Sequence, residues 1–284
     1  MTEHEPQMPF TGKVAVVTGG ARGQGRSHAL ALAERGADVA VCDVCADVDT
    51  VPYPMATSED LEATVRAVEA TGRRCVATVV DVRDAGAVDA FVRSVEGELG
   101  PADIAIANAG ITAITPISTI SPAEWSTLID INLTGTFNLI RAVAPGMAER
   151  GAGRIVTVAS MMGRSANPAI CGYVASKWGV IGLTKSIALE LAASGVTVNA
   201  VAPGNVRTPM IENDWFVKTM RPDLEVPTFD DLAFPLASLH PMGVPWIEPE
   251  EITGAVLYLC SDAARHVTGS VIDVNAGASG AFTA

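Results

Sequence analysis

Basic residues are scarce in this sequence. It has 19 Lys and Arg against 32 Asp and Glu, which gives a formal net charge of -13 over 284 residues, and no cluster of Lys and Arg interrupts the acidic balance. Nucleic acids and anionic membrane surfaces are held through basic patches. We therefore expect neither a nucleic acid nor a membrane as a partner.

Signals for secretion and for metal binding are also missing. No apolar segment follows a basic start, and the number of cysteines, five, is odd. These features predict a reduced, cytoplasmic protein. Cys42 and Cys45 are spaced like half a zinc site or a redox pair, but no second ligand pair follows. We interpret both as packing residues and expect no metal.

Repeats and low-complexity tracts are absent, and short apolar runs alternate with helix-like stretches. This alternation predicts an α/β fold with one doubly wound parallel sheet of about seven strands and helices on both faces. The hydrophobic fraction of 49% allows a substantial core, and we expect residues 1–284 to form a single domain, with two domains as the alternative. The expected strands are 14–18, 38–43, 75–81, 103–107, 154–159, 196–201 and 270–274.

Three segments depart from this rhythm. Residues 1–10 contain two prolines and no apolar periodicity, which predicts a loose N-terminal arm. The connections 44–60 and 205–248 are unusually long, and such loops in a compact domain are usually functional or disordered. Residues 205–248 are too apolar for a disordered tail, so we expect a lid over an apolar ligand; a packing extension or a subunit contact is the alternative. The aromatic residues behind this expectation are Trp215, Phe216, Phe229, Phe234 and Trp246.

A glycine-rich turn follows the first apolar run. Gly19, Gly23 and Gly25, with Arg22 and Gln24 between them, stand before a helix-like stretch over 28–34. A strand, a glycine turn and a helix in this order aim backbone N–H groups and the positive helix end at a pyrophosphate. The spacing differs from the commonest dinucleotide fingerprint, and an ordinary strand-to-helix turn is the alternative. The pattern predicts a Rossmann domain that binds a nucleotide.

Asp43 closes the second apolar run, where a dinucleotide ribose is expected. Its carboxylate can accept hydrogen bonds from the two ribose hydroxyls of NAD and would repel the extra phosphate of NADP. Arg22 favours NADP weakly, because a cation near the ribose attracts phosphate. We predict NAD as the cofactor.

Tyr173 and Lys177 lie four residues apart in an apolar-faced stretch, so a helix places them on one side. A nearby ammonium and the positive ring of NAD+ would lower the pKa of the phenol, which makes Tyr173 a candidate general base. Ser160 ends a predicted strand, where its hydroxyl can hold a substrate oxygen. Taken singly, the pair is typical of an amphipathic surface and the serine of a cap, but their coincidence with the nucleotide turn favours catalysis.

With these residues the sequence resembles the short-chain dehydrogenases/reductases over about residues 12–278. The resemblance implies a catalytic set in which Asn132 holds a water that connects Lys177 to solvent; an Asn that satisfies a helix kink is the structural alternative. It also implies that Asp81 and Val82 border the adenine, and that Val206 and Thr208 contact the nicotinamide carboxamide. The motifs that carry it are Thr18–Gly25, Asp81-Val82, Asn108-Ala109-Gly110 (expected to line the cofactor cleft), Asn132, Ser160, Tyr173-x3-Lys177, Pro203-Gly204 and Thr208.

The chain also resembles a narrower branch, the carveol dehydrogenase-like, mycofactocin-associated members. The insertion 44–60, Trp125 and the motif Pro245-Trp246-Ile-Glu-Pro249 carry this resemblance. It implies an insertion that covers the cofactor, an NAD that does not exchange, and transfer of electrons to an external redox carrier.

The expected function is the NAD-dependent interconversion of a hydrophobic secondary alcohol, such as a carveol-like cyclic terpenoid, and its ketone. A 3-oxoacyl thioester or steroid reductase of the same family is the nearest alternative. A catalytically silent nucleotide sensor and a purely structural assembly partner are the alternatives from other classes. The apolar stretches 124–149 and 173–193 resemble helices that pair subunits in this family, so we expect a homo-oligomer, by resemblance a tetramer.

Overall fold

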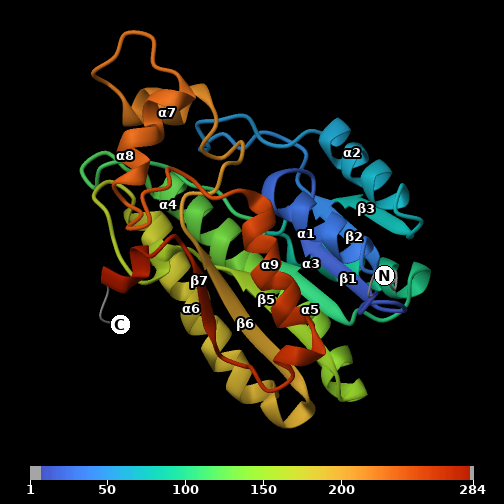
Figure 1. Ribbon diagram of the computed structural model, residues 1–284. Coiled ribbons are helices and arrows are strands. Elements are labelled where there is room, and N and C mark those ends of the chain that lie inside the picture. Colours follow the sequence, from blue (N-terminus) through green and yellow to red (C-terminus); the bar gives the residue numbers. More distant parts are fainter. Residues whose placement is uncertain (1–7, 282–284) are drawn as a thin grey trace, which may run out of the picture.

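A single seven-stranded parallel sheet organises the chain (Figure 1). The computed structural model describes residues 8–281. The strand order is β3-β2-β1-β4-β5-β6-β7, and every pairing is parallel. The strands are β1 (Val14–Thr18), β2 (Asp38–Asp43), β3 (Cys75–Val79), β4 (Ile104–Ala107), β5 (Gly153–Val158), β6 (Val196–Pro203) and β7 (Val271–Val274). The order reverses between β1 and β4, which is where doubly wound sheets bind their ligands.

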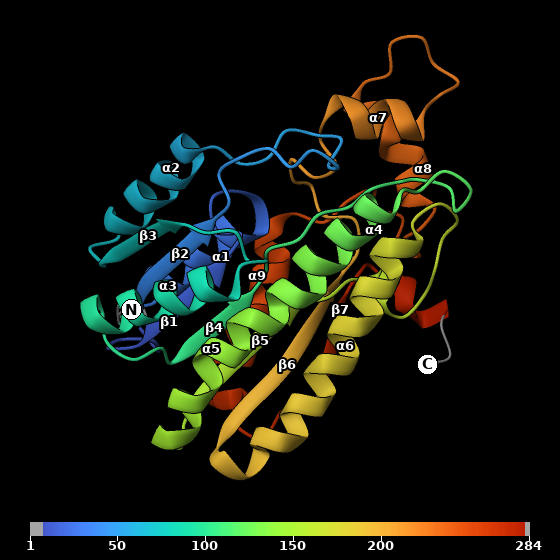
Figure 2. The ribbon, with the colours of Figure 1, turned by 180° about the vertical axis from the view of Figure 1, so that it is seen from behind.

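Helices cover both faces of the sheet, as Figures 1 and 2 show from opposite sides. Helices α1, α2 and α9 lie on one face, and α3, α5 and α6 on the other. The predicted doubly wound α/β fold is confirmed. The helices are α1 (Gly23–Ala33), α2 (Ser58–Glu69), α3 (Ala85–Glu98), α4 (Pro122–Ile129), α5 (Gly135–Arg150), α6 (Cys171–Leu191), α7 (Asp214–Met220), α8 (Ala233–Ala237) and α9 (Pro249–Cys260).

The strands are apolar on both sides because both sides are covered. In β1, Ala15 and Val17 belong to the core beneath α1 and α9, whereas Val14 and Val16 belong to the core beneath α3 and α5. Alternate residues of a strand point to opposite faces, so a strand between two helical layers has no polar side.

Three sequence expectations need correction. Helix α1 begins at Gly23, inside the glycine turn, and not near residue 28. Of the N-terminal arm, residues 1–7 lie outside the described part of the chain, and Phe10 is buried in the core with its N–H donating to the carbonyl of Arg35 at 3.0 Å. The apolar ring therefore anchors the start of the described chain.

The predicted long helix over 124–149 is interrupted. Helices α4 and α5 are joined by a π-helical turn, Asp130–Thr134, called η1 below. Helix α4 begins sharply because Ser121 accepts a hydrogen bond from the N–H of Glu124 at 3.1 Å and Pro122 occupies the first turn. The π-helical turn contains Asn132, so the irregularity falls on a predicted catalytic residue.

The two long connections lie together at the carboxyl end of the sheet. In Figures 1 and 2 the blue loop between β2 and α2 and the orange segment with α7 and α8 stand at the same end of the molecule. The first follows β2 and the second follows β6, so both leave the carboxyl ends of strands. Among residues 8–281, no helix has the length and apolar character needed to span a membrane.

Candidate active site

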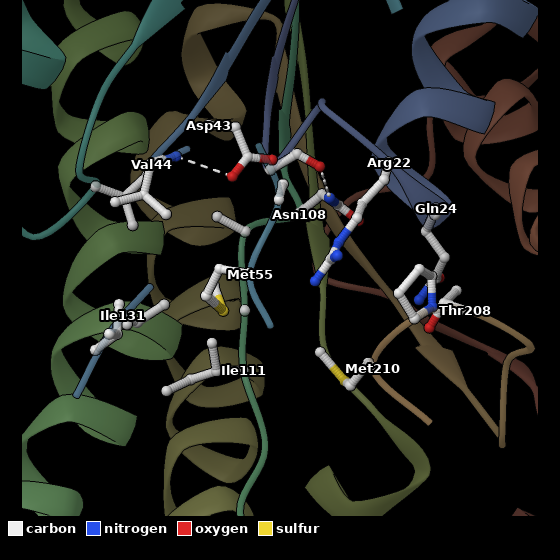
Figure 3. Close-up of a pocket in the computed structure, with 18 of the residues that line it drawn as sticks. Arg22, Gln24, Asp43, Val44, Met55, Asn108, Ile111, Ile131, Thr208 and Met210 are labelled. Atoms are coloured by element: carbon white, nitrogen blue, oxygen red, sulfur yellow. Dashed lines mark hydrogen bonds between the residues drawn. The ribbon is translucent and has the colours of Figure 1, made fainter. Parts of the chain in front are cut away.

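The glycine turn forms one wall of a cleft at the β1/β4 switch point (Figure 3). Gly19 has a φ of +64°, and a Cβ on it would come within 2.8 Å of the Ala109 Cα. A Cβ on Gly25 would overlap the carbonyl oxygen of Gly19. Glycine is thus required at both positions, because the turn folds back on itself and packs against the loop after β4. The predicted residues Gly19, Arg22, Gly23, Gln24, Asp43, Asp81, Val82, Asn108, Ala109, Gly110 and Thr208 all line this cleft.

Asp43 lies at the end of β2 with both carboxylate oxygens engaged. Oδ2 accepts the N–H of Ala21 at 3.1 Å, and Oδ1 accepts the N–H of Val44 at 2.9 Å. Burial raises the pKa of Asp43, while these two N–H groups and the charge of Arg22 oppose that rise. Each oxygen keeps lone-pair capacity for a further donor. The carboxylate is therefore placed to receive the hydroxyls of a ribose.

The side chain of Arg22 is hydrogen-bonded to the insertion. Its Nη2 donates to the carbonyl oxygen of Pro54 at 2.6 Å. Arg22, which weakly favours NADP in the sequence, thus connects the glycine turn to the insertion.

Asp81 lies at the far end of the cleft, beside Val82. Burial alone would raise the pKa of Asp81, but hydrogen bonds from Arg83 bring it below its usual range, and the ion pair closes at 2.5 Å. Val82 is buried against the glycine at the start of α5. This end of the cleft combines an apolar surface with a neutralised carboxylate.

The insertion contributes to the lining of the cleft. Val44, Val48, Tyr53, Met55 and Ala56 line it, and the cofactor-proximal role of 44–60 stays a prediction. Sequence reasoning missed Tyr53 as an individual residue. The signal was a lone aromatic residue between two prolines within a loop.

The catalytic candidates meet in a second cavity that adjoins the cleft. Ser160 follows β5, Tyr173 lies in the first turn of α6, and Lys177 lies one turn further on. The Lys177 Nζ donates to the Val158 carbonyl at 2.8 Å and lies 5.7 Å from the centroid of the Tyr173 ring. The predicted serine, tyrosine and lysine are therefore brought to one place.

Without NAD, the protein raises the pKa of Tyr173; the lowering expected from the ammonium together with the positive ring of NAD+ stays a prediction. Burial raises the pKa of the phenol, and a hydrogen bond with Ser160 opposes this rise. Burial also lowers the pKa of Lys177 to about 8. Desolvation penalises the charged form of each group and is the largest cause of both shifts.

Asn132 has a structural task in η1. Its Oδ1 accepts the N–H of Ile111 at 2.8 Å, and its Nδ2 donates to the Ile111 carbonyl and the Ser176 Oγ, both at 3.0 Å. The side chain thereby ties the loop after β4 to α6. These contacts are those expected of an Asn that satisfies a helix kink. The water-holding role of Asn132 stays a prediction.

The second cavity is apolar away from the catalytic residues. It has a volume of about 430 Å³, within the range of small-molecule sites. The segment 205–248 supplies much of its wall, and its role as a substrate lid stays a prediction. The lining side chains of this segment include Val206, Thr208, Met210, Ile211, Phe216, Met220, Leu236 and Leu239.

Of the five aromatic residues that predicted the lid, only Phe216 lines the cavity. Phe229 and Trp246 pack against each other at 4.7 Å and both contact the guanidinium of Arg207. Phe234 is 86% exposed. Most of these rings therefore stabilise the lid or lie on its surface, and methionine and aliphatic side chains provide the apolar wall.

Cys42 is buried in the core, and burial with the neighbouring Asp43 raises its thiol pKa far above the ordinary value. Cys45 is partly buried and its pKa is also raised, mainly by burial. Neither thiol has the depressed pKa of a redox pair, which agrees with a packing role. No cluster of three His, Cys, Asp or Glu side chains suited to a metal occurs among residues 8–281.

Comparisons with known proteins agree with this geometry. The family model described as short chain dehydrogenase matches residues 13–216. The chain is 42% identical to (-)-trans-carveol dehydrogenase of Rhodococcus erythropolis over 269 residues, which cover 94% of this chain and 97% of the relative. This chain belongs to the short-chain dehydrogenase family.

Solved structures show the same relationship. Carveol dehydrogenase from Mycobacterium avium, in complex with NAD, superposes with a TM-score of 0.93 at 43% identity, covering 95% of this chain and 98% of the other. A short chain dehydrogenase from Mycobacterium paratuberculosis, bound to NAD, gives a TM-score of 0.87 at 37% identity, covering 96% and 99%. The predicted resemblance to carveol dehydrogenases is confirmed.

Proposed function

We propose that this chain is an NAD-dependent dehydrogenase that interconverts a hydrophobic secondary alcohol and its ketone. One observation carries the proposal: the apolar cavity that holds the catalytic residues adjoins the glycine-turn cleft. Five residues line both spaces, namely Gln24, Asn108, Gly110, Thr208 and Met210. A substrate carbon in the cavity and a cofactor in the cleft would thus meet at a shared boundary.

NAD supplies the acceptor for a hydride from the alcohol carbon. Ser160 and Tyr173 hold the hydroxyl group, and Tyr173 takes its proton as general base. Lys177 sits beside the phenol, where its ammonium stabilises the phenolate and orients the ribose. Asn132 fixes the loop after β4, and we assign it the water that links Lys177 to solvent.

The choice of NAD rests on Asp43 and on the relatives. A carboxylate in a partly buried cleft repels a ribose phosphate and binds ribose hydroxyls. The solved relatives named above were found with NAD. Val206 and Thr208 lie on the cavity side of the cleft and are assigned to the nicotinamide carboxamide.

For the substrate we propose a cyclic terpenoid alcohol of the carveol type, supported by the apolar wall and by the activity named for the Rhodococcus relative. A 3-oxoacyl thioester or steroid reductase remains the second candidate. The test is a panel of terpenoid alcohols, steroid alcohols and 3-hydroxyacyl thioesters, followed by the absorbance of the reduced nicotinamide. If only the 3-hydroxyacyl thioesters reduced NAD, the terpenoid assignment would be overturned.

We further propose that the insertion 44–60 acts as a cofactor cover within a single domain and that NAD stays bound between turnovers. The contact from Arg22 to Pro54 and the residues of the insertion that line the cleft support this. A retained cofactor needs an external redox carrier to remove its electrons. Protein purified without added nucleotide should contain NAD; empty protein that turns over freely with added NAD contradicts retention.

A homo-oligomer, as a tetramer, is the proposed assembly. Phe137 of α5 is 43% exposed, and it lines a shallow apolar groove with Leu133, Gly179 and Leu183 between α5 and α6. Light scattering of the purified chain measures the subunit number. The five free thiols agree with a cytoplasmic location.

A further inference from the structure

A buried histidine, His240, connects the two ends of the segment 205–248. Its side chain is 2% exposed and follows α8, and the neighbouring Leu239 lines the catalytic cavity. The Nε2 of His240 accepts the N–H of Asn205 at 3.2 Å, and its Nδ1 lies 2.8 Å from the carbonyl oxygen of Val244. The imidazole therefore contacts the first residue of the segment and a residue near its end.

These backbone partners fix both the tautomer and the orientation of the ring. A backbone N–H group only donates, so the Nε2 of His240 must present a free lone pair to Asn205. A carbonyl oxygen only accepts, so Nδ1 must carry the hydrogen that Val244 receives. A ring turned by half a rotation would present carbon atoms to both groups. His240 is thus an acceptor toward the loop after β6 and a donor toward the lid.

Gly204 allows the imidazole to come close to that loop. A Cβ on Gly204 would come within 2.6 Å of the His240 Nε2. The N–H of Gly204 donates to the Val274 carbonyl at 3.0 Å, and that of Arg207 donates to the Ile247 carbonyl at 2.9 Å. The backbone of β7 and residue 247 therefore hold two N–H groups of the loop, and the side chain of His240 holds a third.

The loop that His240 holds forms the boundary between the two spaces of the site. Val206 lines the catalytic cavity, and Thr208 lines both this cavity and the glycine-turn cleft. Leu239, which precedes His240, lines the cavity from the lid. The imidazole therefore determines how the lid wall stands against the side of the site assigned to the nicotinamide.

We propose that His240 is a positioning residue for the hydride-transfer reaction. By accepting the N–H of Asn205, its Nε2 holds the loop 204–208 against the lid and fixes the surface that receives the nicotinamide ring. His240 lines neither the cleft nor the catalytic cavity, so it acts through the loop. The inference rests on the proposed NAD-dependent function and is independent of which alcohol is oxidised.

Two variants separate the two contacts of the ring. His240→Gln keeps an acceptor near the position of Nε2, whereas His240→Asn keeps a donor near the position of Nδ1 and loses the acceptor for Asn205. Calorimetry measures the affinity for NAD and for ADP-ribose, which lacks the nicotinamide ring; where nucleotide co-purifies, dissociation half-times are compared. We expect His240→Asn to weaken NAD about 3- to 10-fold and ADP-ribose less than about twofold, and His240→Gln to bind both like the wild type.

Hydrogen exchange of the Asn205 amide measures the contact itself, without any ligand. We expect this amide to exchange about 3- to 10-fold faster in His240→Asn and at nearly the wild-type rate in His240→Gln. His266→Asn is the matched control, because His266 is exposed and lines neither space. It should change neither nucleotide affinity nor the exchange of Asn205.

Equal weakening of NAD and ADP-ribose in both variants would overturn the inference, because it would reduce the role of His240 to general stability. Unchanged NAD affinity in His240→Asn would overturn it as well. A wild type that binds neither ligand would refute the proposed function, and this failure is recognisable because the exchange of the Asn205 amide would still differ between the two variants.

Discussion

The rings of Tyr53 and Trp215 lie 5.7 Å apart, and this contact joins the insertion after β2 to the lid after β6. Tyr53 is 5% exposed and its hydroxyl oxygen accepts the N–H of Thr112 at 3.0 Å. One side chain of the insertion thus contacts both the lid and the loop after β4. We therefore expect movement of the lid to be coupled to exposure of the cofactor cleft.

Tyr53→Phe keeps the ring but leaves the buried N–H of Thr112 without an acceptor. We expect a loss of about 1–3 kcal/mol in the free energy of unfolding and faster release of NAD. Trp215→Ala, which removes the ring contact, should accelerate release further. Chemical denaturation and nucleotide dissociation rates measure the two effects. Tyr258→Phe on the half-exposed surface of α9 is the control, and an equal effect there would contradict the coupling.

Asp43→Asn keeps the shape of the side chain and removes its charge. Since hydrogen bonds to a charged group contribute about 1.5–3 kcal/mol, we expect NAD to bind about 10- to 100-fold more weakly. NADP should improve relative to NAD because the repulsion of its phosphate is lost. Dissociation constants for both cofactors test this. An unchanged preference would show that Asp43 does not select the cofactor.

The rate of alcohol oxidation should rise with pH, because Tyr173 must lose its proton and burial raises its pKa. The hydrogen bond with Ser160 lowers the pKa of Tyr173. Ser160→Ala should therefore raise this pKa and move the pH at which the oxidation rate increases to a higher value. Tyr173→Phe should lower turnover about 10²–10⁴-fold with little effect on NAD binding. Profiles of kcat against pH measure the shift. A shift toward lower pH in Ser160→Ala would contradict the assigned contact.

Two glycine-to-alanine changes should have different effects: one should abolish NAD binding, and the other should stabilise the fold. Gly25→Ala places a Cβ against the carbonyl of Gly19, so the turn must deform and NAD binding should be lost. Gly97→Ala in α3 meets nothing within 4 Å and should stabilise the protein by about 0.5–1 kcal/mol. Thermal unfolding and NAD titration distinguish the two. Normal NAD affinity in Gly25→Ala would refute the proposed phosphate turn.

His28 should make the protein sensitive to acid. Its Nδ1 lies 2.7 Å from Thr253 Oγ1, and burial lowers its pKa from 6.5 to about 3. Below pH 6.5 the unfolded chain binds a proton that the folded chain does not, so stability falls by about 1.4 kcal/mol per pH unit until the pKa of about 3 is reached.

His28→Asn keeps a donor for Thr253 and does not titrate. The variant should therefore lose less stability than the wild type between pH 6 and pH 4. This range lies between the pKa of His28 in the unfolded chain, 6.5, and its pKa in the folded chain, about 3. Urea unfolding at several pH values measures the slopes. Identical slopes would show that another group causes the acid sensitivity.

Local patterns explain why so much of the fold was predictable. Apolar runs such as that of β1 and the glycines at 19, 23 and 25 act over a few residues, so their structures follow from neighbouring sequence. The end of an apolar run also predicts the position of Ser160 after β5, and Ser160 and Tyr173 line one cavity.

Other features depend on contacts between distant segments. The packing of Tyr53 on Trp215 and the burial of Phe10 arise from tertiary structure, which no periodicity encodes. The burial that raises the pKa of Tyr173 in the protein without cofactor also comes from tertiary structure, whereas the neighbouring Lys177 is visible in the sequence.

The π-helical turn η1 also constrains how the helix can change in length. Each residue of an α-helix turns the chain by about 100°, so deleting one residue between α4 and α5 could restore regular geometry only by rotating one helix against the other. The Asn132 amide would then leave Ile111 and Ser176, and the loop after β4 would lose its attachment to α6. A deletion that makes this helix more regular would therefore remove a support of the candidate active site.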